Sequence, residues 1–198
     1  GFCILELSKN LMIDFHYNVM KKNFVCDLMF TDTDSLCYNI HLSNKAFEEA
    51  LVRKGLTDYF DFSIYSPDHP LYSEKNKMVI GKFKDECPEG IEEFIGLRSK
   101  MYSYLKFSGE GIQKGKGIKK TVLEHIKHNE YKDVLTNSLE EQHTMNMFRT
   151  ENQTIYTVQM RKTSLSCYDN KRYIRDNGID TLAYGNYKIN YKDVTNDI

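Results

Sequence analysis

The chain has 198 residues, of which 40% are hydrophobic and 13% aromatic, enough for the core of one ordinary domain or two small ones. Its 27 basic and 28 acidic residues leave a net charge of −1, which excludes a global basic field, so nucleic-acid contacts must come from local patches. Five cysteines without a Cys-x-x-Cys pair argue against a zinc site or a disulfide framework and fit an intracellular, reducing compartment. No run of about 18 apolar residues is present, so no membrane contact is expected.

Apolar residues at helical spacing predict an amphipathic helix of about five turns that begins near Ile4. Lys21, Lys22 and Asn23 are expected to end this helix. We interpret its apolar stripe as core packing rather than as a binding face. The stripe comprises Ile4, Leu7, Leu11, Met12, Phe15 and Val19.

Residues 32–35, Asp-Thr-Asp-Ser, lie between two short apolar runs, residues 26–30 and 36–40. This arrangement predicts a β-hairpin in which Asp32 and Asp34 share one face, because side chains two residues apart in a strand project to the same side. Converging carboxylates suit Mg²⁺ or Mn²⁺, and Mg²⁺ is usually held together with substrate phosphates. The spacing alone also fits an ordinary polar turn whose side chains bond the local backbone.

A short helix is predicted over residues 44–51, and Pro67 and Pro70 indicate an irregular loop after it. Residues 78–83 and 100–107 are both predicted to be extended.

In the second extended segment, Lys100 and Tyr102 are expected on the same strand face. An ammonium group could then reach a backbone phosphate while the neighbouring phenol donates to sugar, phosphate or a base edge. The alternative is a solvated lysine on an edge strand beside a half-buried tyrosine.

Glycines within residues 109–117, interleaved with lysines, are expected to break regular structure and to mark a boundary between two lobes after residue 107. Residues 106–127 hold six lysines against two glutamates, a local excess of four positive charges. Such a loop suits sequence-independent contact with duplex DNA, for which Lys116 and Lys119 are candidates; a solvated lysine surface is the alternative. The same alternative applies to a second, weaker cluster, Lys75, Lys77, Lys82 and Lys84.

Residues 121–124 fit a capping box, and the apolar residues after them predict a helix that Asn129 interrupts. Short strands and turns are predicted over the tail, residues 154–198. His125 and His128 are the only histidine pair at a metal-ligand spacing, and we interpret them as surface histidines.

Two segments together resemble a known family. Residues 30–35, Phe-Thr-Asp-Thr-Asp-Ser, resemble the third palm motif of family B DNA polymerases, a Tyr-x-Asp-Thr-Asp-Ser hairpin, with Phe30 in place of the usual tyrosine. Residues 97–102, Leu-Arg-Ser-Lys-Met-Tyr, resemble the Lys-x-Tyr motif that follows in the same palm. Their order and separation are similar to those of the protein-primed branch. Further segments, residues 5–9, 15–17, 81–86 and 169–173, resemble polymerases of Maverick or Polinton transposons.

The resemblance implies an α+β fold, with an antiparallel palm portion and packed helices over residues 1–107 and a thumb-like, carboxy-terminal lobe over residues 108–198. It would start the later helix near Asn129 and make the segment before it a strand. The implied activity is DNA-directed DNA synthesis through two Mg²⁺ or Mn²⁺ ions. The implied partners are primer-template DNA, deoxynucleoside triphosphates and a terminal protein primer, in the nucleus or cytoplasm.

The resemblance also implies roles for four residues. Asp34 would be a direct ligand of the catalytic metal ions, and Asp32 a second acidic group that tunes or completes their site. Lys100 and Tyr102 would hold the primer terminus near these ions.

A complete site of this family needs another aspartate, in an Asp-x-x-Ser-Leu-Tyr-Pro motif, and a lysine on a fingers helix, and neither motif occurs in the 198 residues. Because both normally precede the hairpin, we expect a fragment that does not polymerise by itself. Two other functions remain open: a non-catalytic DNA-binding remnant, and a nucleotide-sugar glycosyltransferase. The glycosyltransferase would require a parallel nucleotide-binding sheet and would give Lys100 no role.

Overall fold

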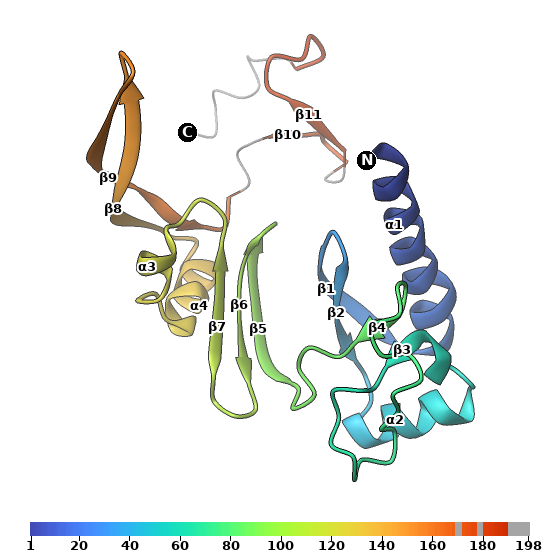
Figure 1. The fold of residues 1–198 in the computed structure, drawn as a ribbon. Coiled ribbons are helices and arrows are strands. Elements are labelled where there is room, and N and C mark those ends of the chain that lie inside the picture. The colour runs from blue at the N-terminus through green and yellow to red at the C-terminus, as the bar shows by residue number, and fades with distance from the viewer. Residues whose placement is uncertain (169–171, 178–179, 190–198) are drawn as a thin grey trace.

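A computed structural model describes residues 1–168, 172–177 and 180–189 and combines helices with small, open sheets. In Figure 1, the amino-terminal helix, the first hairpin and the short helix after it form one group, and a three-stranded sheet with its helices forms a second group beside it. Most strand pairs are antiparallel, and the one parallel pair among the described strands, β3 with β4, is two residues long. The expected α+β class is confirmed.

The first group packs around one hydrophobic core, to which the helix, the hairpin and α2 all contribute. Ser43 caps α2, because its hydroxyl accepts a hydrogen bond from the backbone N–H of Ala46. The elements of the group are α1 (Phe2–Asp14), η1 (Phe15–Lys21), β1 (Cys26–Asp32), β2 (Ser35–Ile40), α2 (Asn44–Arg53), η2 (Thr57–Tyr59), β3 (Phe60–Asp61) and β4 (Phe83–Lys84).

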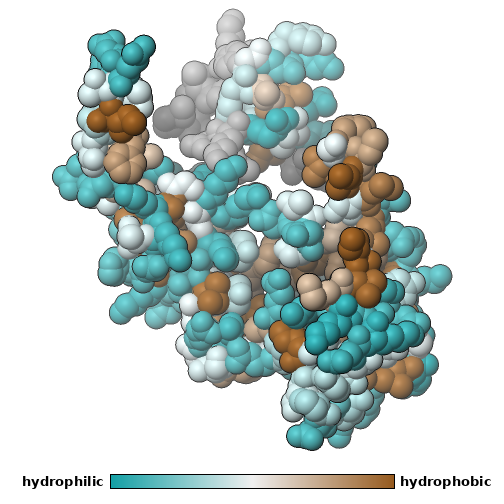
Figure 2. Space-filling view, in the orientation of Figure 1, coloured by the Kyte–Doolittle hydropathy of each residue, from teal (hydrophilic) through white to brown (hydrophobic). Residues whose placement is uncertain are grey.

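The amino-terminal helix forms where expected and continues from α1 into the π-helical η1. Only the later part of its stripe is buried, however. Phe15 and Val19 lie in the core, whereas Ile4 is 72% exposed and Leu7 is 70% exposed. The prediction of core packing is therefore wrong for the first half, because the elements that form the core contact the helix only from its middle onward (Figures 1 and 2).

The prediction of an extended segment over residues 78–83 is also wrong. This segment forms turns, in which Met78 and Gly81 both adopt positive φ angles, and only Phe83 and Lys84 join a strand. The carboxylate of Asp61 accepts the backbone N–H of Met78 and so holds the turn in place.

The second group is a β5–β6–β7 sheet with α4 packed against it. Its core contains the fully buried side chains of Met101, Tyr131, Val134 and Leu165. The elements are β5 (Ile91–Arg98), β6 (Met101–Lys106), β7 (Gly111–Gly115), α3 (Lys120–Leu123), α4 (His128–Asn137), β8 (Glu140–Glu151) and β9 (Thr154–Ser166). The strands β10 (Arg172–Ile174) and β11 (Thr181–Ala183) form a separate two-stranded sheet.

The glycine-rich segment breaks regular structure only in part, because Gly109 and Gly117 lie outside the strands with positive φ angles whereas the residues between them extend the sheet. Gly111–Gly115 form β7, which pairs along the length of β6, so the boundary expected after residue 107 lies within one sheet. Glycine permits this strand because a Cβ on Gly115 would lie 2.5 Å from the side chain of Ile118.

The helix expected after residue 121 is split. The short α3 ends at Leu123, and α4 begins at His128, so the interruption precedes Asn129. This start of α4 agrees with the family resemblance, whereas the strand that the resemblance placed before it is a short helix.

Strand β9 is longer than the short strands expected in the tail, and it forms a long hairpin with β8, which precedes the tail. The strands of this hairpin have 12 and 13 residues and are joined at Asn152 and Gln153, which both have the positive φ angles of a tight hairpin turn. The short strands β10 and β11 pair beyond it. The tail predictions for residues 169–171, 178–179 and 190–198 lie outside the described residues.

Candidate active site at the acidic hairpin

The hairpin predicted at residues 32–35 forms, with Asp32 paired opposite Ser35. Thr33 has a φ of 58°, a left-handed conformation that is strained for a β-branched residue. Because the chain turns here, strand alternation ends at Asp32, and Thr33 lines the same cleft as the two aspartates instead of pointing away.

The alternative prediction, a polar turn whose side chains bond the local backbone, is confirmed in part. The hydroxyls of Thr33 and Ser35 donate to the carboxylate and carbonyl of Asp32, at 3.4 and 3.3 Å. Within the described residues, the Asp34 carboxylate has no hydrogen-bond or ion-pair partner. Asp34 is therefore the carboxylate of this turn that is open to an external ligand.

Lys100 joins the two motifs that are far apart in the sequence. Its Nζ lies 2.7 Å from Oδ1 of Asp32, and its hydrogen bond holds the pKa of Asp32 below the usual aspartate range. The expected position within a strand is wrong, because Lys100 lies in the turn between β5 and β6 with a φ of 59°. This turn, rather than strand alternation, directs Lys100 toward the hairpin.

Tyr102 lies on β6 and stacks on Phe30 of the hairpin, with ring centroids 4.2 Å apart. Phe30, the residue that departs from the family motif, also stacks on Phe94 at 5.7 Å. Burial raises the pKa of Tyr102, so its phenol stays protonated at neutral pH and can donate a hydrogen bond.

Residues 32–35 of the hairpin, Lys100 and Tyr102 line one open cleft of about 610 Å³ between the hairpin and the sheet. The backbone N–H of Lys116 donates to the carbonyl of Lys100 at 3.0 Å, which fixes the end of β7 beside the cleft. The side chains around the cleft comprise two carboxylates, three ammonium groups and one phenol: Asp32, Asp34, Lys100, Lys114, Lys116 and Tyr102.

The candidate DNA contacts separate in the structure. Lys116 lines the cleft, whereas Lys119 lies at the start of α3 and faces a different hollow, against Met145 and Phe148 of β8. Lys114 lines the cleft but was not singled out from the sequence, because its role depends on the unforeseen strand β7. Tyr131 of α4 donates its hydroxyl to the carbonyl of Lys114 at 3.0 Å, so the core supports this wall.

Several other lysines are neutralised by neighbours. Lys75 pairs with Asp58, and Lys77 pairs with Glu74. Lys106 lies between Glu89 and Glu110, at 3.3 and 2.6 Å. The contacts of Lys75 and Lys77 favour the solvated-surface interpretation of the weaker lysine cluster.

His128 is not a surface histidine, so that prediction is wrong for this residue. Its side chain is buried between α4 and the sheet, where it contacts the hydroxyl of Ser103 at 2.8 Å and the carboxylate of Glu93 at 3.3 Å. His125 is exposed, as expected.

The donors of the cleft fit a divalent cation in part. Carboxylate oxygens are hard ligands that Mg²⁺ and Mn²⁺ prefer, and Asp34 supplies one without giving up another partner. Asp32 would have to share its oxygens between the ion and Lys100.

No protein-family profile, curated protein or solved structure matches the chain. Within the described residues, no helix has the length and apolar character needed to cross a membrane.

Lys100→Ala is expected to raise the pKa of Asp32 toward the ordinary aspartate value, because the strongest hydrogen bond to its carboxylate is lost. Since the pKa of Asp32 is lowered in the folded chain, the ion pair stabilises the fold above the ordinary aspartate pKa, and this contribution disappears as the pH falls through the lowered value. NMR titration of the Asp32 carboxyl carbon measures the shift. Lys75→Ala, which frees Asp58 instead, should leave it unchanged; an Asp32 pKa unaffected by Lys100→Ala would contradict the ion pair.

Proposed function

We propose that this chain is a palm segment of a family B DNA-directed DNA polymerase of the protein-primed type. The observation that carries the proposal is the ion pair between Asp32 and Lys100, with Tyr102 in the same cleft. Two segments that resemble successive palm motifs are far apart in the sequence, and they meet at one site. If either segment resembled its motif only by chance, nothing would require the two segments to lie at the same site.

In this proposal Mg²⁺ or Mn²⁺, when bound, activates the attacking 3′ oxygen of the primer and stabilises the leaving pyrophosphate. Asp34 holds the ion, and Asp32 completes or tunes its site. Lys100 contacts a backbone phosphate of the primer, and the protonated phenol of Tyr102 donates to sugar, phosphate or a base edge.

The lysines on the opposite wall extend this surface. Lys114 and Lys116 place two further ammonium groups on the cleft, where they can neutralise phosphates of the primer or template strand. Because the Asp-x-x-Ser-Leu-Tyr-Pro and fingers-lysine motifs do not occur in these 198 residues, we propose that the chain alone binds primed DNA weakly and does not polymerise.

The two other functions receive different support. A glycosyltransferase would use a parallel nucleotide-binding sheet, whereas parallel pairing among the described strands is limited to β3 and β4. The glycosyltransferase function also gives no role to Lys100, which contacts Asp32. A non-catalytic DNA-binding remnant would use the same lysines, and it differs from the polymerase proposal in giving Asp34 no role.

Lys100→Ala and Lys116→Ala are each expected to weaken binding of a primed DNA duplex and to lower the slope of log affinity against log salt by about 1, the value for one lost phosphate contact. Fluorescence anisotropy across a salt series measures both quantities. Lys75→Ala is the matched control, because Lys75 is an exposed lysine paired with Asp58 outside the cleft. Equal losses of affinity in all three variants would show that binding depends only on the general surface charge, and would overturn the proposed interface.

A further inference from the structure

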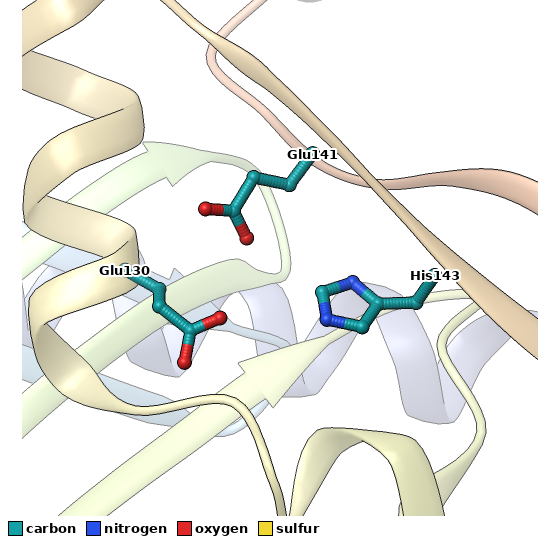
Figure 3. Close-up of side chains that lie close together, drawn as sticks. All are labelled: Glu130, Glu141 and His143. Carbon is teal, nitrogen blue, oxygen red and sulfur yellow. The ribbon is translucent and has the colours of Figure 1, made fainter.

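A second group of ionisable side chains lies outside the cleft, between α4 and β8. Glu130 comes from the first turn of α4, and Glu141 and His143 come from the start of β8. One ligand atom from each residue lies within 4.8 Å of the other two. Figure 3 shows the two carboxylates and the imidazole directed toward the space between the helix and the strand.

Ser164 on β9 fixes the tautomer of His143. The Ser164 hydroxyl donates its single hydrogen to the carbonyl of Glu141 at 3.0 Å, so it must accept the hydrogen bond from Nδ1 of His143 at 2.6 Å. Nδ1 therefore carries the proton in the neutral ring, and the lone pair of Nε2 has no hydrogen-bond partner among the described residues. A histidine ligand held through its other ring nitrogen in this way is the usual outer-shell arrangement of metal sites.

Glu141 supplies an independent observation. Its Oε2 is buried from solvent and has no hydrogen-bond partner among the described residues. A buried oxygen without a partner, next to a second carboxylate, is costly unless a proton or a cation lies between the two groups.

Glu130 is held in place while it keeps one oxygen available. Its Oε1 accepts the backbone N–H of Lys127 at 2.8 Å and so caps α4. Its side chain also lies within reach of the carboxyl group of Glu141. The helix cap thus orients this carboxylate toward Glu141 and His143.

We propose that Glu130, Glu141 and His143 bind one divalent transition-metal ion, with Zn²⁺ as the favoured ion, and that this ion fastens the base of the β8–β9 hairpin to α4. One imidazole nitrogen with carboxylate oxygens suits Zn²⁺ better than Mg²⁺, which prefers oxygen ligands alone. Zn²⁺ lies about 2.0–2.2 Å from such donors, so small side-chain shifts bring all three to a common ion. Water completes the coordination.

The site is tested with the full chain by calorimetric titration with Zn²⁺ and by thermal unfolding with and without it. All variants carry Asp34→Asn, so that ion binding at the hairpin does not contribute. At Zn²⁺ concentrations about 100-fold above Kd, the melting temperature is expected to rise by about 5–10 °C. Mg²⁺ at the same concentration should give no comparable rise.

Glu141→Gln distinguishes the ion site from a merely structural cluster. Without metal this variant should melt at the same temperature or higher, because it removes a crowded charge, whereas with Zn²⁺ it should lose the rise. His143→Ala should lose the rise as well. Ser164→Ala should weaken Zn²⁺ affinity by about 10–100-fold with the three ligands intact, as expected for a residue that orients a ligand.

Glu124→Gln and His125→Ala are matched controls, because both residues are exposed and lie outside the cluster. Both should keep the full Zn²⁺ effect. The proposal is overturned if Zn²⁺ leaves the melting temperature unchanged, or if the rise persists in Glu141→Gln and His143→Ala. Neither result bears on the polymerase proposal, since these residues do not line the cleft at the hairpin.

Discussion

Asp34→Asn is expected to abolish the gain in affinity for primed DNA that Mg²⁺ gives to the unmodified chain. Asp34 is the carboxylate of the cleft without a partner among described residues, so a bound ion would join it to a DNA phosphate. We expect Mg²⁺ to raise the affinity of the unmodified chain about tenfold, or about 1.4 kcal/mol, and that of the variant hardly at all. Anisotropy titrations with and without Mg²⁺ at matched ionic strength measure this difference.

Without metal the same variant is expected to change affinity in the opposite direction. Removing one negative charge about 4 Å from a phosphate relieves about 1 kcal/mol of repulsion in water, so Asp34→Asn should bind about fivefold more tightly. Asp68→Asn, an exposed aspartate outside the cleft, should show neither effect. If Asp34→Asn leaves binding unchanged in both conditions, the non-catalytic remnant is the better description.

Tyr131→Ala is expected to lower the free energy of unfolding by about 3–5 kcal/mol, the cost of truncating a fully buried aromatic side chain. Tyr131 is completely buried in the core of the second group, and its hydroxyl bonds the carbonyl of Lys114 behind the cleft. Urea unfolding followed by circular dichroism measures the loss.

Tyr131→Phe separates the hydrogen bond from the packing and should cost about 1–3 kcal/mol, because the carbonyl of Lys114 loses its donor. Tyr17→Ala is the control, since Tyr17 is 62% exposed on the amino-terminal helix, and it should change stability by less than about 0.5 kcal/mol. An unfolding free energy of Tyr131→Ala close to that of the unmodified chain would contradict the described core.

The hairpin could be predicted because its determinants are local: two apolar runs around a polar turn specify it without any partner. The contact of Lys100 with Asp32 could be expected only from the family resemblance. Its geometry was wrongly derived from strand alternation, since periodicity does not report where a chain turns with a positive φ.

Other differences arise where tertiary packing outweighs local pattern. The glycines of β7 discourage a strand by propensity, yet pairing with β6 holds a strand there. The apolar stripe of α1 has a clear helical period, but periodicity does not tell which turns of a helix other elements cover. For this reason Leu7 was wrongly assigned to the core.

The cluster of Glu130, Glu141 and His143 was missed for a related reason. A cysteine or histidine partner at ligand spacing is the usual sequence signal of a histidine ligand, and His143 has neither. Its partners are glutamates, one of which lies on a different element and comes close only because α4 packs at the base of β8. The local signal is the Glu-x-His spacing of Glu141 and His143, which places both side chains on one face of a strand.

We propose that the acidic hairpin, Lys100 and Tyr102 form one cation-binding cleft. Paramagnetic broadening by Mn²⁺ in the NMR spectrum tests this proposal most directly. The signals around His143 report separately on ion binding at the cluster of Glu130, Glu141 and His143. The account predicts that Mn²⁺ broadens the signals of Asp34 and Tyr102 in the unmodified chain, and that Asp34→Asn prevents this. Equal broadening of Tyr102 in the variant, or none at the hairpin in the unmodified chain, would contradict it.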